Sequence, residues 1–183
     1  MLFRSVDLVH QFGFLTNWMV VGPFHNDERS GYATVFPPET ELDLNAEYDG
    51  KIGATTWKPY STEDTLGMVT FNDAYDPFKE VTGYAYTEFH TDNPRQVELR
   101  LGSQNAWKVW LNGEYVFGRD EYHRGREIDQ YTMPVRLKAG KNTLLIKVCQ
   151  NEQRETWTQE WDFQIRVCDP TGTAIHSSKQ VQF

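Results

Sequence analysis

The stretch Trp107-Lys108-Val109-Trp110-Leu111-Asn112-Gly113-Glu114-Tyr115-Val116-Phe117 decides the fold class. Two runs rich in β-branched and aromatic residues flank the dipeptide Asn112-Gly113. A type I′ turn needs positive φ at both central residues, and Asn-Gly adopts that conformation readily. Asn-Gly between two such runs is therefore the strongest short-range signal for a β-hairpin. We predict a tight hairpin here, with a two-residue loop at Asn112-Gly113.

The same alternation of apolar and polar residues, with a period of two, recurs through the second half of the chain. The clearest example is Val97-Glu98-Leu99-Arg100-Leu101. Many short strands separated by turn residues are typical of two packed antiparallel sheets. We predict an all-β antiparallel sandwich of about nine or ten strands, without long helices. The predicted strands cover residues 17–21, 55–59, 66–71, 81–90, 97–101, 107–111, 114–117, 131–137, 142–150 and 158–168.

The length of 183 residues suits one domain with a sizeable core. We predict a single domain over residues 1–183, with its core within about residues 17–172. Residues 23–54 are rich in Pro and Gly and lack the strand alternation. They could link two domains, but few residues precede them. We favour a segment that wraps over one face of the sandwich, anchored by Phe24, Tyr32, Phe36 and Leu44.

The charge balance excludes several classes of partner. Lys and Arg number 18 and Asp and Glu 26, which gives a net charge of −8. Nucleic-acid binding and docking on anionic membranes both need clustered basic residues, so we expect neither. No run approaches the ~18 apolar residues of a membrane span. Aromatic residues make up 14% of the chain, which indicates a folded globular protein.

The first seven residues lack a basic stretch followed by an apolar segment, so no signal peptide is expected in this chain. Cys149 and Cys168 both occupy predicted strand positions. If residues 150–157 turn a hairpin, the two sulfurs lie about nine strand positions apart, on the order of 30 Å. A disulfide cannot bridge that distance, so we predict two buried, unpaired thiols.

Several motifs lie along most of the chain. They are Trp18-x-x-x-Gly22-Pro23-Phe24, Pro37-Pro38-Glu39, Trp57, Gly83-Tyr84-Ala85-Tyr86, Leu101-Gly102-Ser103, Lys108 to Gly113, and Leu137-x-x-Gly140-x-Asn142-x-Leu144-Leu145-x-Lys147-Val148. Together these motifs resemble the galactose-binding-like jelly-roll domains of bacterial, notably planctomycete-type, multidomain proteins. The motifs from Leu101 onward are also similar to the sugar-binding domain of family 2 glycoside hydrolases. The resemblance implies a carbohydrate-binding or docking module with an extracellular or cell-surface location, whose expected partners are an oligo- or polysaccharide and other domains of a larger protein.

The usual signatures of enzymes and cofactor sites are missing, including the nucleophile elbow, the zinc-protease helix and the phosphate-binding loops. We therefore predict no catalytic residues and no cofactor. A structural calcium ion, common in the resembled fold, stays open without an assigned site. The acidic loop at residues 119–129 leaves a glycosidase carboxylate pair open as well, although acids in a polar loop are usually only solvated.

Strand direction indicates where a ligand site would lie. If consecutive strands reverse, the short turns at 91–94, 112–113 and 138–141 share one end of the sandwich. The longer connections then gather at the opposite end, and long clustered loops commonly carry binding sites. Trp and Tyr rings among planar polar groups suit a sugar, because pyranose C–H faces lie on aromatic rings. The predicted ligand-binding residues are Trp57, Asp120, Tyr122, Arg124, Asn151, Arg154 and Trp157.

These observations support two hypotheses of different classes. The first is a non-catalytic carbohydrate-binding module that serves as an accessory domain. The second is a structural or protein-interaction sandwich without a sugar ligand, which uses the same loops or a strand face bearing Trp110. The Trp and Tyr residues of the loops favour the first hypothesis.

Overall fold

The computed structural model describes residues 6–183 as an all-β protein built from antiparallel strands, as predicted. The first five residues, and with them most of the stretch searched for a signal peptide, lie outside the described residues. The strands of this part are β1 (Asn17–His25), β2 (Glu47–Gly50), β3 (Gly53–Thr56), β4 (Lys58–Ser61), β5 (Val69–Thr70), β6 (Val81–Thr91), β7 (Arg95–Gly102), β8 (Ala106–Leu111), β9 (Glu114–Arg119), β10 (Tyr131–Leu137), β11 (Gly140–Gln150) and β12 (Asp162–Cys168).

Helical segments in the described residues are short. They are α1 (Leu8–Phe12), η1 (Asp27–Tyr32), α2 (Pro37–Thr40), α3 (Phe71–Ala74) and η2 (Thr156–Thr158). No helix among residues 6–183 has the length and hydrophobicity needed to cross a membrane.

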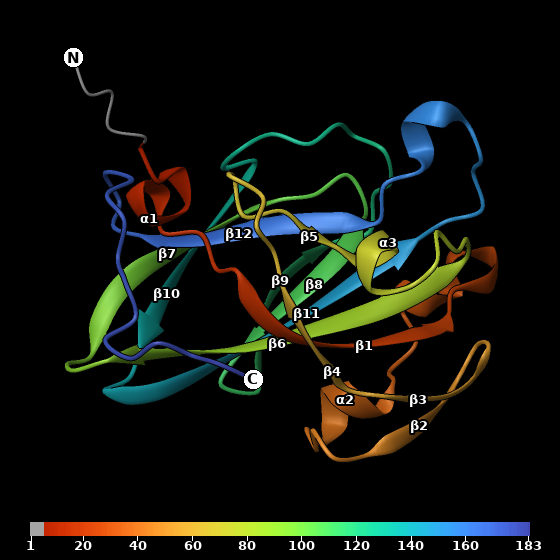
Figure 1. Ribbon diagram of the computed structural model, residues 1–183, viewed down its shortest axis with the longest axis horizontal. Helices are drawn as coiled ribbons and strands as arrows, with labels where there is room; N and C mark the ends of the chain where they lie inside the picture. The colour runs from red at the N-terminus through yellow and green to blue at the C-terminus, as the bar shows by residue number, and fades with distance from the viewer. Residues whose placement is uncertain (1–5) are drawn as a thin grey trace.

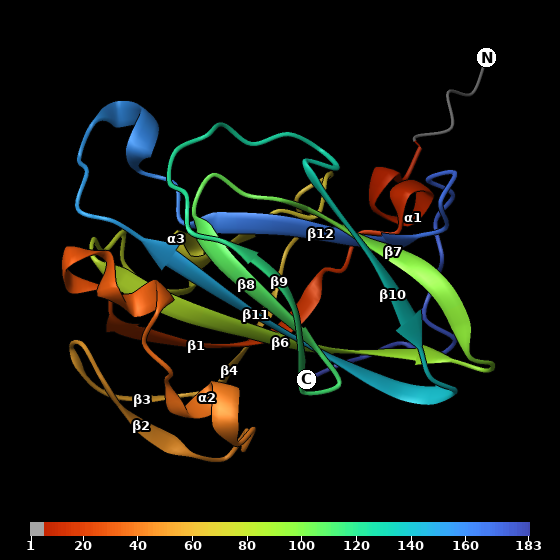
Figure 2. The same ribbon diagram turned by 180° about the vertical axis from the view of Figure 1, so that it is seen from behind.

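Two sheets form the layers of the sandwich (Figures 1 and 2). The larger has the strand order β4-β1-β6-β11-β8-β9, and the smaller has the order β10-β7-β12-β5. A separate two-stranded sheet, β2-β3, lies beside the larger one. The main core fills the space between the two layers, where alternate residues point inward. Ala85, Ile146 and Val109, for example, lie side by side on β6, β11 and β8.

A second apolar cluster covers the outer face of the six-stranded sheet. The alternate residues Tyr86, Leu145 and Trp110 form a row across the same three strands. The segment predicted to wrap over the sandwich lies on this row, with Phe24 buried and Phe36 and Leu44 packed against the cluster. Because both faces of the sheet are covered at its centre, the strands β6 and β11 are buried almost throughout.

The Asn112-Gly113 hairpin is confirmed. β8 ends at Leu111 and β9 begins at Glu114, so two residues form the loop. Their φ angles are 53° and 80°, the left-handed values that a type I′ turn requires. The Asn112 side chain also accepts a hydrogen bond from the backbone N–H of Thr143, which ties the turn to β11.

The predicted hairpin between residues 142–150 and 158–168 is wrong. β11 pairs with β6 and β8 in one sheet, whereas β12 pairs with β7 and β5 in the other. The intervening residues therefore cross from layer to layer. Cys149 and Cys168 lie on these two strands, and both are buried and free. Burial raises the pKa of the Cys149 thiol to about 11, so the thiol is unreactive at neutral pH.

Candidate functional site

Three connections meet at the end of the sandwich that lies on the right in Figure 1. They are the segment around η1, the loop 119–129 and the loop 150–157, here called the loop end. The last two were predicted to meet, and the structure joins them: His123 Nε2 lies 2.8 Å from Asn151 Oδ1. The first connection was not predicted at this place. It joins the others through Asn26, whose Nδ2 donates to the Tyr122 hydroxyl at 3.1 Å and to the Gln150 carbonyl at 2.8 Å.

Buried amide side chains hold the loop end together. Asn26, Asn105, Gln150 and Asn151 are at most 1% exposed. Asn105 Nδ2 donates to Gln150 Oε1, and Gln150 Nε2 donates to the carbonyls of Thr158 and Glu160. An amide has both donors and acceptors, so it can satisfy several backbone groups of irregular loops at once. This network makes the loop end a built surface rather than a set of independent loops.

Asn151 belongs to this framework, which corrects its predicted role as a sugar contact. Its Oδ1 faces His123 and accepts from the backbone N–H of Gln153, while its Nδ2 donates to Gln153 Oε1. The side chain is wholly buried and therefore supports the loop instead of meeting a ligand.

Trp57 is also placed differently from the prediction. It is 6% exposed and packs in the second apolar cluster, edge to face with Tyr86 at 6.5 Å. Its indole N–H donates to the Tyr48 hydroxyl of β2 at 3.2 Å. Because the wrapping segment covers this ring, Trp57 is a core residue of the outer face and offers no stacking surface.

Trp157 is the most exposed aromatic ring of the loop end, at 59%. It lies on η2, and the His123 ring meets it edge to face at 5.6 Å with an interplanar angle of 88°. The next residue, Thr158, is wholly buried, and its carbonyl accepts from Gln150 Nε2 and Lys79 Nζ. The exposed indole thus sits on a firmly held turn.

Tyr122 is partly committed to the fold. Its hydroxyl accepts the hydrogen bond from Asn26, and the Arg29 guanidinium lies 5.4 Å from the centre of its ring. Burial raises the pKa of this phenol above its usual value. Arg29 also forms a bidentate pair with Glu152 across the loop end, which lowers the pKa of the Glu152 carboxyl to about 2.

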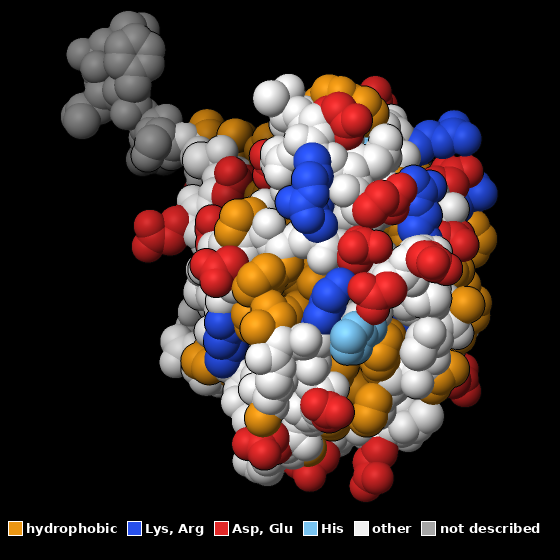
Figure 3. Space-filling view, turned by 90° about the vertical axis from the view of Figure 1, so that its right-hand side faces the viewer, with side chains coloured by type: hydrophobic (Ala, Val, Ile, Leu, Met, Phe, Trp, Pro, Cys, Tyr) orange, Lys and Arg blue, Asp and Glu red, His pale blue; other side chains and the backbone are white. Residues whose placement is uncertain are grey.

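The remaining predicted side chains are exposed. Arg124 pairs with Glu121 at 3.2 Å within its own loop. Asp120 and Arg154 have no side-chain hydrogen bond or ion pair among residues 6–183, so they are free to meet a ligand. Figure 3 looks onto this end of the molecule and shows acidic and basic side chains interspersed around apolar patches. The mixture of signs suits a polar, mostly uncharged ligand better than a polyanion.

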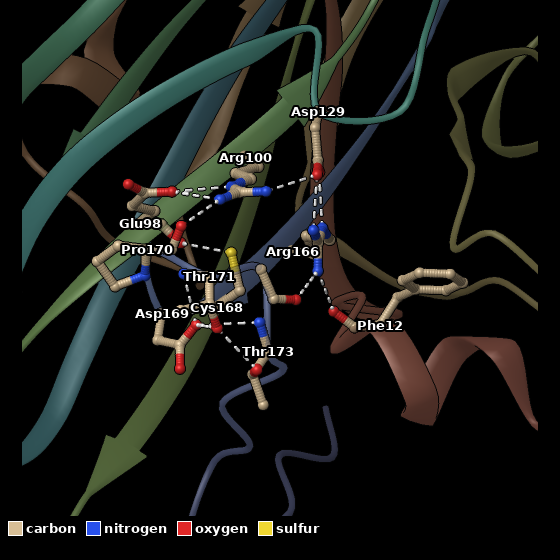
Figure 4. Close-up of polar contacts among 11 residues, drawn as sticks. Phe12, Glu98, Arg100, Asp129, Arg166, Cys168, Asp169, Pro170, Thr171 and Thr173 are labelled. Atoms are coloured by element: carbon tan, nitrogen blue, oxygen red, sulfur yellow. Dashed lines mark hydrogen bonds and ion pairs between the residues drawn. The ribbon is translucent and has the colours of Figure 1, made fainter.

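Three ion pairs, each with at least one largely buried partner, hold the far part of the loop 119–129 against the four-stranded sheet. Arg126 donates to Asp162 of β12, whose side chain is 2% exposed. Asp129 accepts from Arg100 of β7 and, with both oxygens, from Arg166 of β12 (Figure 4). Arg166 also donates to the carbonyls of Phe12 and Gly172, so this centre joins both ends of the described chain to the sheet.

The buried carboxyl of Asp162 should make the stability of the protein depend on pH in an unusual way. Burial raises its pKa from 3.8 to about 6, and its Oδ1 is buried without a hydrogen-bond donor. Between these two values the folded protein holds a proton that the unfolded chain has lost, so this group destabilises the fold as pH rises from 4 to 6. Between pH 4 and pH 6, the free energy of unfolding of wild type should fall by on the order of 2 kcal/mol relative to that of Asp162→Asn. Urea unfolding of both proteins at several pH values measures the difference, and parallel curves would contradict it.

No metal site is evident in residues 6–183: no group of three or more His, Cys, Asp or Glu side chains there could hold an ion. A structural calcium ion, which the family resemblance leaves open, stays a prediction without an assigned site.

No known family profile and no curated protein matches the sequence. Among solved structures, the chain is similar to a β-glucosidase from Kluyveromyces marxianus in complex with glucose, with 13% identity over 86% of this chain and a TM-score of 0.48. It is also similar to a β-glucuronidase from Ruminococcus gnavus in complex with uronic isofagomine, with 11% identity over 85% of this chain and a TM-score of 0.45. A rhamnosidase from Novosphingobium sp. PP1Y has 14% identity over 90% of this chain and a TM-score of 0.41.

This chain spans only a small part of each of those proteins: 16% of the β-glucosidase, 28% of the β-glucuronidase and 16% of the rhamnosidase.

Proposed function

We propose that this chain is a non-catalytic carbohydrate-binding domain, an accessory part of a larger protein that acts outside the cell or at its surface. The observation that carries the proposal is the exposed indole of Trp157 on a loop end that buried amide side chains hold together. A firmly held indole that is open to solvent provides a flat surface on which a ligand ring can pack.

The chemistry of the loop end suits a saccharide. One face of a pyranose ring presents C–H groups that pack on an indole, while its hydroxyls need planar polar partners. Asp120, Arg124 and Arg154 are exposed on the two loops that join Trp157 to the rest of the site. His123 supports the indole edge to face. We propose Trp157 as the stacking platform and the three charged side chains as hydroxyl partners.

The proposal predicts a large loss of binding in Trp157→Ala. Truncating an aromatic anchor commonly removes at least ~2 kcal/mol of binding energy, which corresponds to about thirtyfold in affinity. The thermal midpoint should stay nearly unchanged, because the ring is mostly exposed in the free protein. A glycan array identifies the polysaccharide, and affinity gel electrophoresis then compares the variants.

Tyr115→Ala is the matched control, because this ring is 55% exposed on β9, next to the hairpin turn at Asn112-Gly113. It should leave the retardation of the protein in the gel unchanged. Full binding by Trp157→Ala would show that the loop end is not the site, and the absence of any array signal would contradict a carbohydrate-binding function.

A structural or protein-interaction domain is the alternative, and one observation favours it. β9 is the edge strand of the larger sheet and exposes Tyr115 at 55% and Phe117 at 40%. Trp110, which the sequence analysis placed on an exposed strand face, is only 8% exposed and belongs to the second cluster. An interaction surface would therefore centre on β9, and cross-linking of the full-length protein through a cysteine placed at Tyr115 tests it.

A further inference from the structure

A small hollow opens on the outer face of the six-stranded sheet, away from the loop end. It measures about 290 Å³. The row that crosses β6, β11 and β8, formed by Tyr86, Leu145 and Trp110, lines it on the sheet side. Residues 38–40 and 42 of the wrapping segment line it on another side. The size is close to the lower limit of small-molecule pockets, roughly 300 Å³.

A carboxylate lies at one side of this hollow. Glu39 is nearly buried, and its Oε1 accepts from Lys147 Nζ at 2.7 Å and from the Tyr84 hydroxyl at 2.5 Å. No donor among residues 6–183 contacts its other oxygen, Oε2. Lys147 is wholly buried and compensates the charge of Glu39. The free oxygen therefore suits a neutral hydroxyl rather than a cation, because the carboxylate already has its counterion.

A second free polar group lies on β11 beside the turn of the β8-β9 hairpin. Thr143 lines the hollow, and its hydroxyl has no hydrogen-bond partner among residues 6–183. A hydroxyl can both donate and accept. The hollow thus combines aromatic and aliphatic walls with two unused hydrogen-bonding groups that come from different parts of the chain.

We propose that this hollow is a second ligand site, which binds one monosaccharide unit or a comparable cyclic polyol. Its C–H groups would contact the Tyr86–Leu145–Trp110 row, and its hydroxyls would bond to Glu39 Oε2 and Thr143 Oγ1. The site shares no residue with the loop end and does not depend on the function proposed for that end.

The test is saturation-transfer NMR with methyl β-glucopyranoside and methyl β-galactopyranoside as probes. Wild type should transfer saturation to the C–H protons of at least one of them. Thr143→Phe fills the hollow and should abolish the transfer, while Thr143→Val, which removes only the hydroxyl, should weaken affinity about three- to tenfold. Thr132→Phe makes the same substitution at an exposed position of β10 in the other sheet and should leave the transfer unchanged. All three variants keep the Glu39–Lys147 pair intact.

The result with Trp157→Ala separates this inference from the function proposed for the loop end. Transfer that survives in Trp157→Ala and disappears in Thr143→Phe supports a second site, whatever the polysaccharide experiments show. Transfer that disappears in Trp157→Ala and survives in Thr143→Phe overturns it. The absence of transfer to both glycosides in wild type also overturns it. Tetramethylammonium serves as a cationic probe: if it receives saturation in wild type and Thr143→Phe abolishes that transfer, the hollow binds a cation and the inference is overturned.

Discussion

Lys147→Met is expected to lower the free energy of unfolding by about 3–5 kcal/mol, because it leaves Glu39 as an unpaired charge in a nearly buried position. Lys147 is wholly buried on the outer face of β11, and burial lowers the pKa of its ammonium group. Besides Glu39, it donates to the carbonyls of Tyr32 and Thr34. One side chain therefore fastens the wrapping segment to the sheet, and urea unfolding of the variant measures the effect.

Lys141→Met is the matched control on the same strand. Its ammonium group is 54% exposed and pairs with Glu88 at the surface, where an ion pair contributes at most ~1 kcal/mol. The double variant Lys147→Met/Glu39→Gln has no unpaired charge, so it should be more stable than Lys147→Met alone. Equal effects of Lys147→Met and Lys141→Met would show that the buried pair does not hold the wrapping segment.

Asp129→Ala is also expected to lower the free energy of unfolding by about 3–5 kcal/mol, because it leaves the buried Arg166 guanidinium without its carboxylate partner. The Arg166 side chain is 4% exposed and makes two bonds to Asp129 (Figure 4). Arg100 keeps Glu98 as a partner, so the unpaired charge falls on Arg166. Thermal unfolding should show a lower midpoint. Limited proteolysis should show earlier cleavage in the loop 119–129.

The acid side of the stability profile provides a second test of Asp129. The two guanidinium groups, Arg166 first, hold the pKa of Asp129 below its usual 3.8. Its contribution is complete above that value and disappears as pH falls through the lower folded-state pKa. The difference between wild type and Asp129→Ala should therefore shrink below about pH 4. Asp120→Ala, at an exposed position of the same loop, serves as the control and should change stability little at any pH.

Local sequence signals predicted the elements of this fold well. Period-two alternation indicated β7 to β12, and the chemistry of Asn112-Gly113 indicated its turn, because both depend on neighbouring residues only. Strand direction also led to the loop end, since reversing strands place alternate connections at opposite ends. The contact between His123 and Asn151 is the physical result of that alternation.

Partners distant in the sequence were not predictable in the same way. Alternation shows that a residue faces inward or outward, but not which sheet its strand joins, so β11 and β12 were paired wrongly. It also gives no sign that another segment covers an outward face. Trp57 was therefore taken for a site residue, although the wrapping segment buries it. Asn26 directly follows β1 in the structure, but the predicted strand ended at residue 21, so no local signal marked Asn26.

The sequence by itself determined that this protein is an antiparallel all-β domain of acidic charge with aromatic loops at one end, because alternation, turn residues and composition are local or additive properties. Only the tertiary structure decided which of those side chains reach solvent. Asn151 and Lys147 are polar residues that the fold buries and satisfies, whereas Trp157 is an apolar residue that it leaves exposed. The physical reason is that burial depends on contacts between segments more than 100 residues apart, such as Asn26 with Gln150 and Glu39 with Lys147.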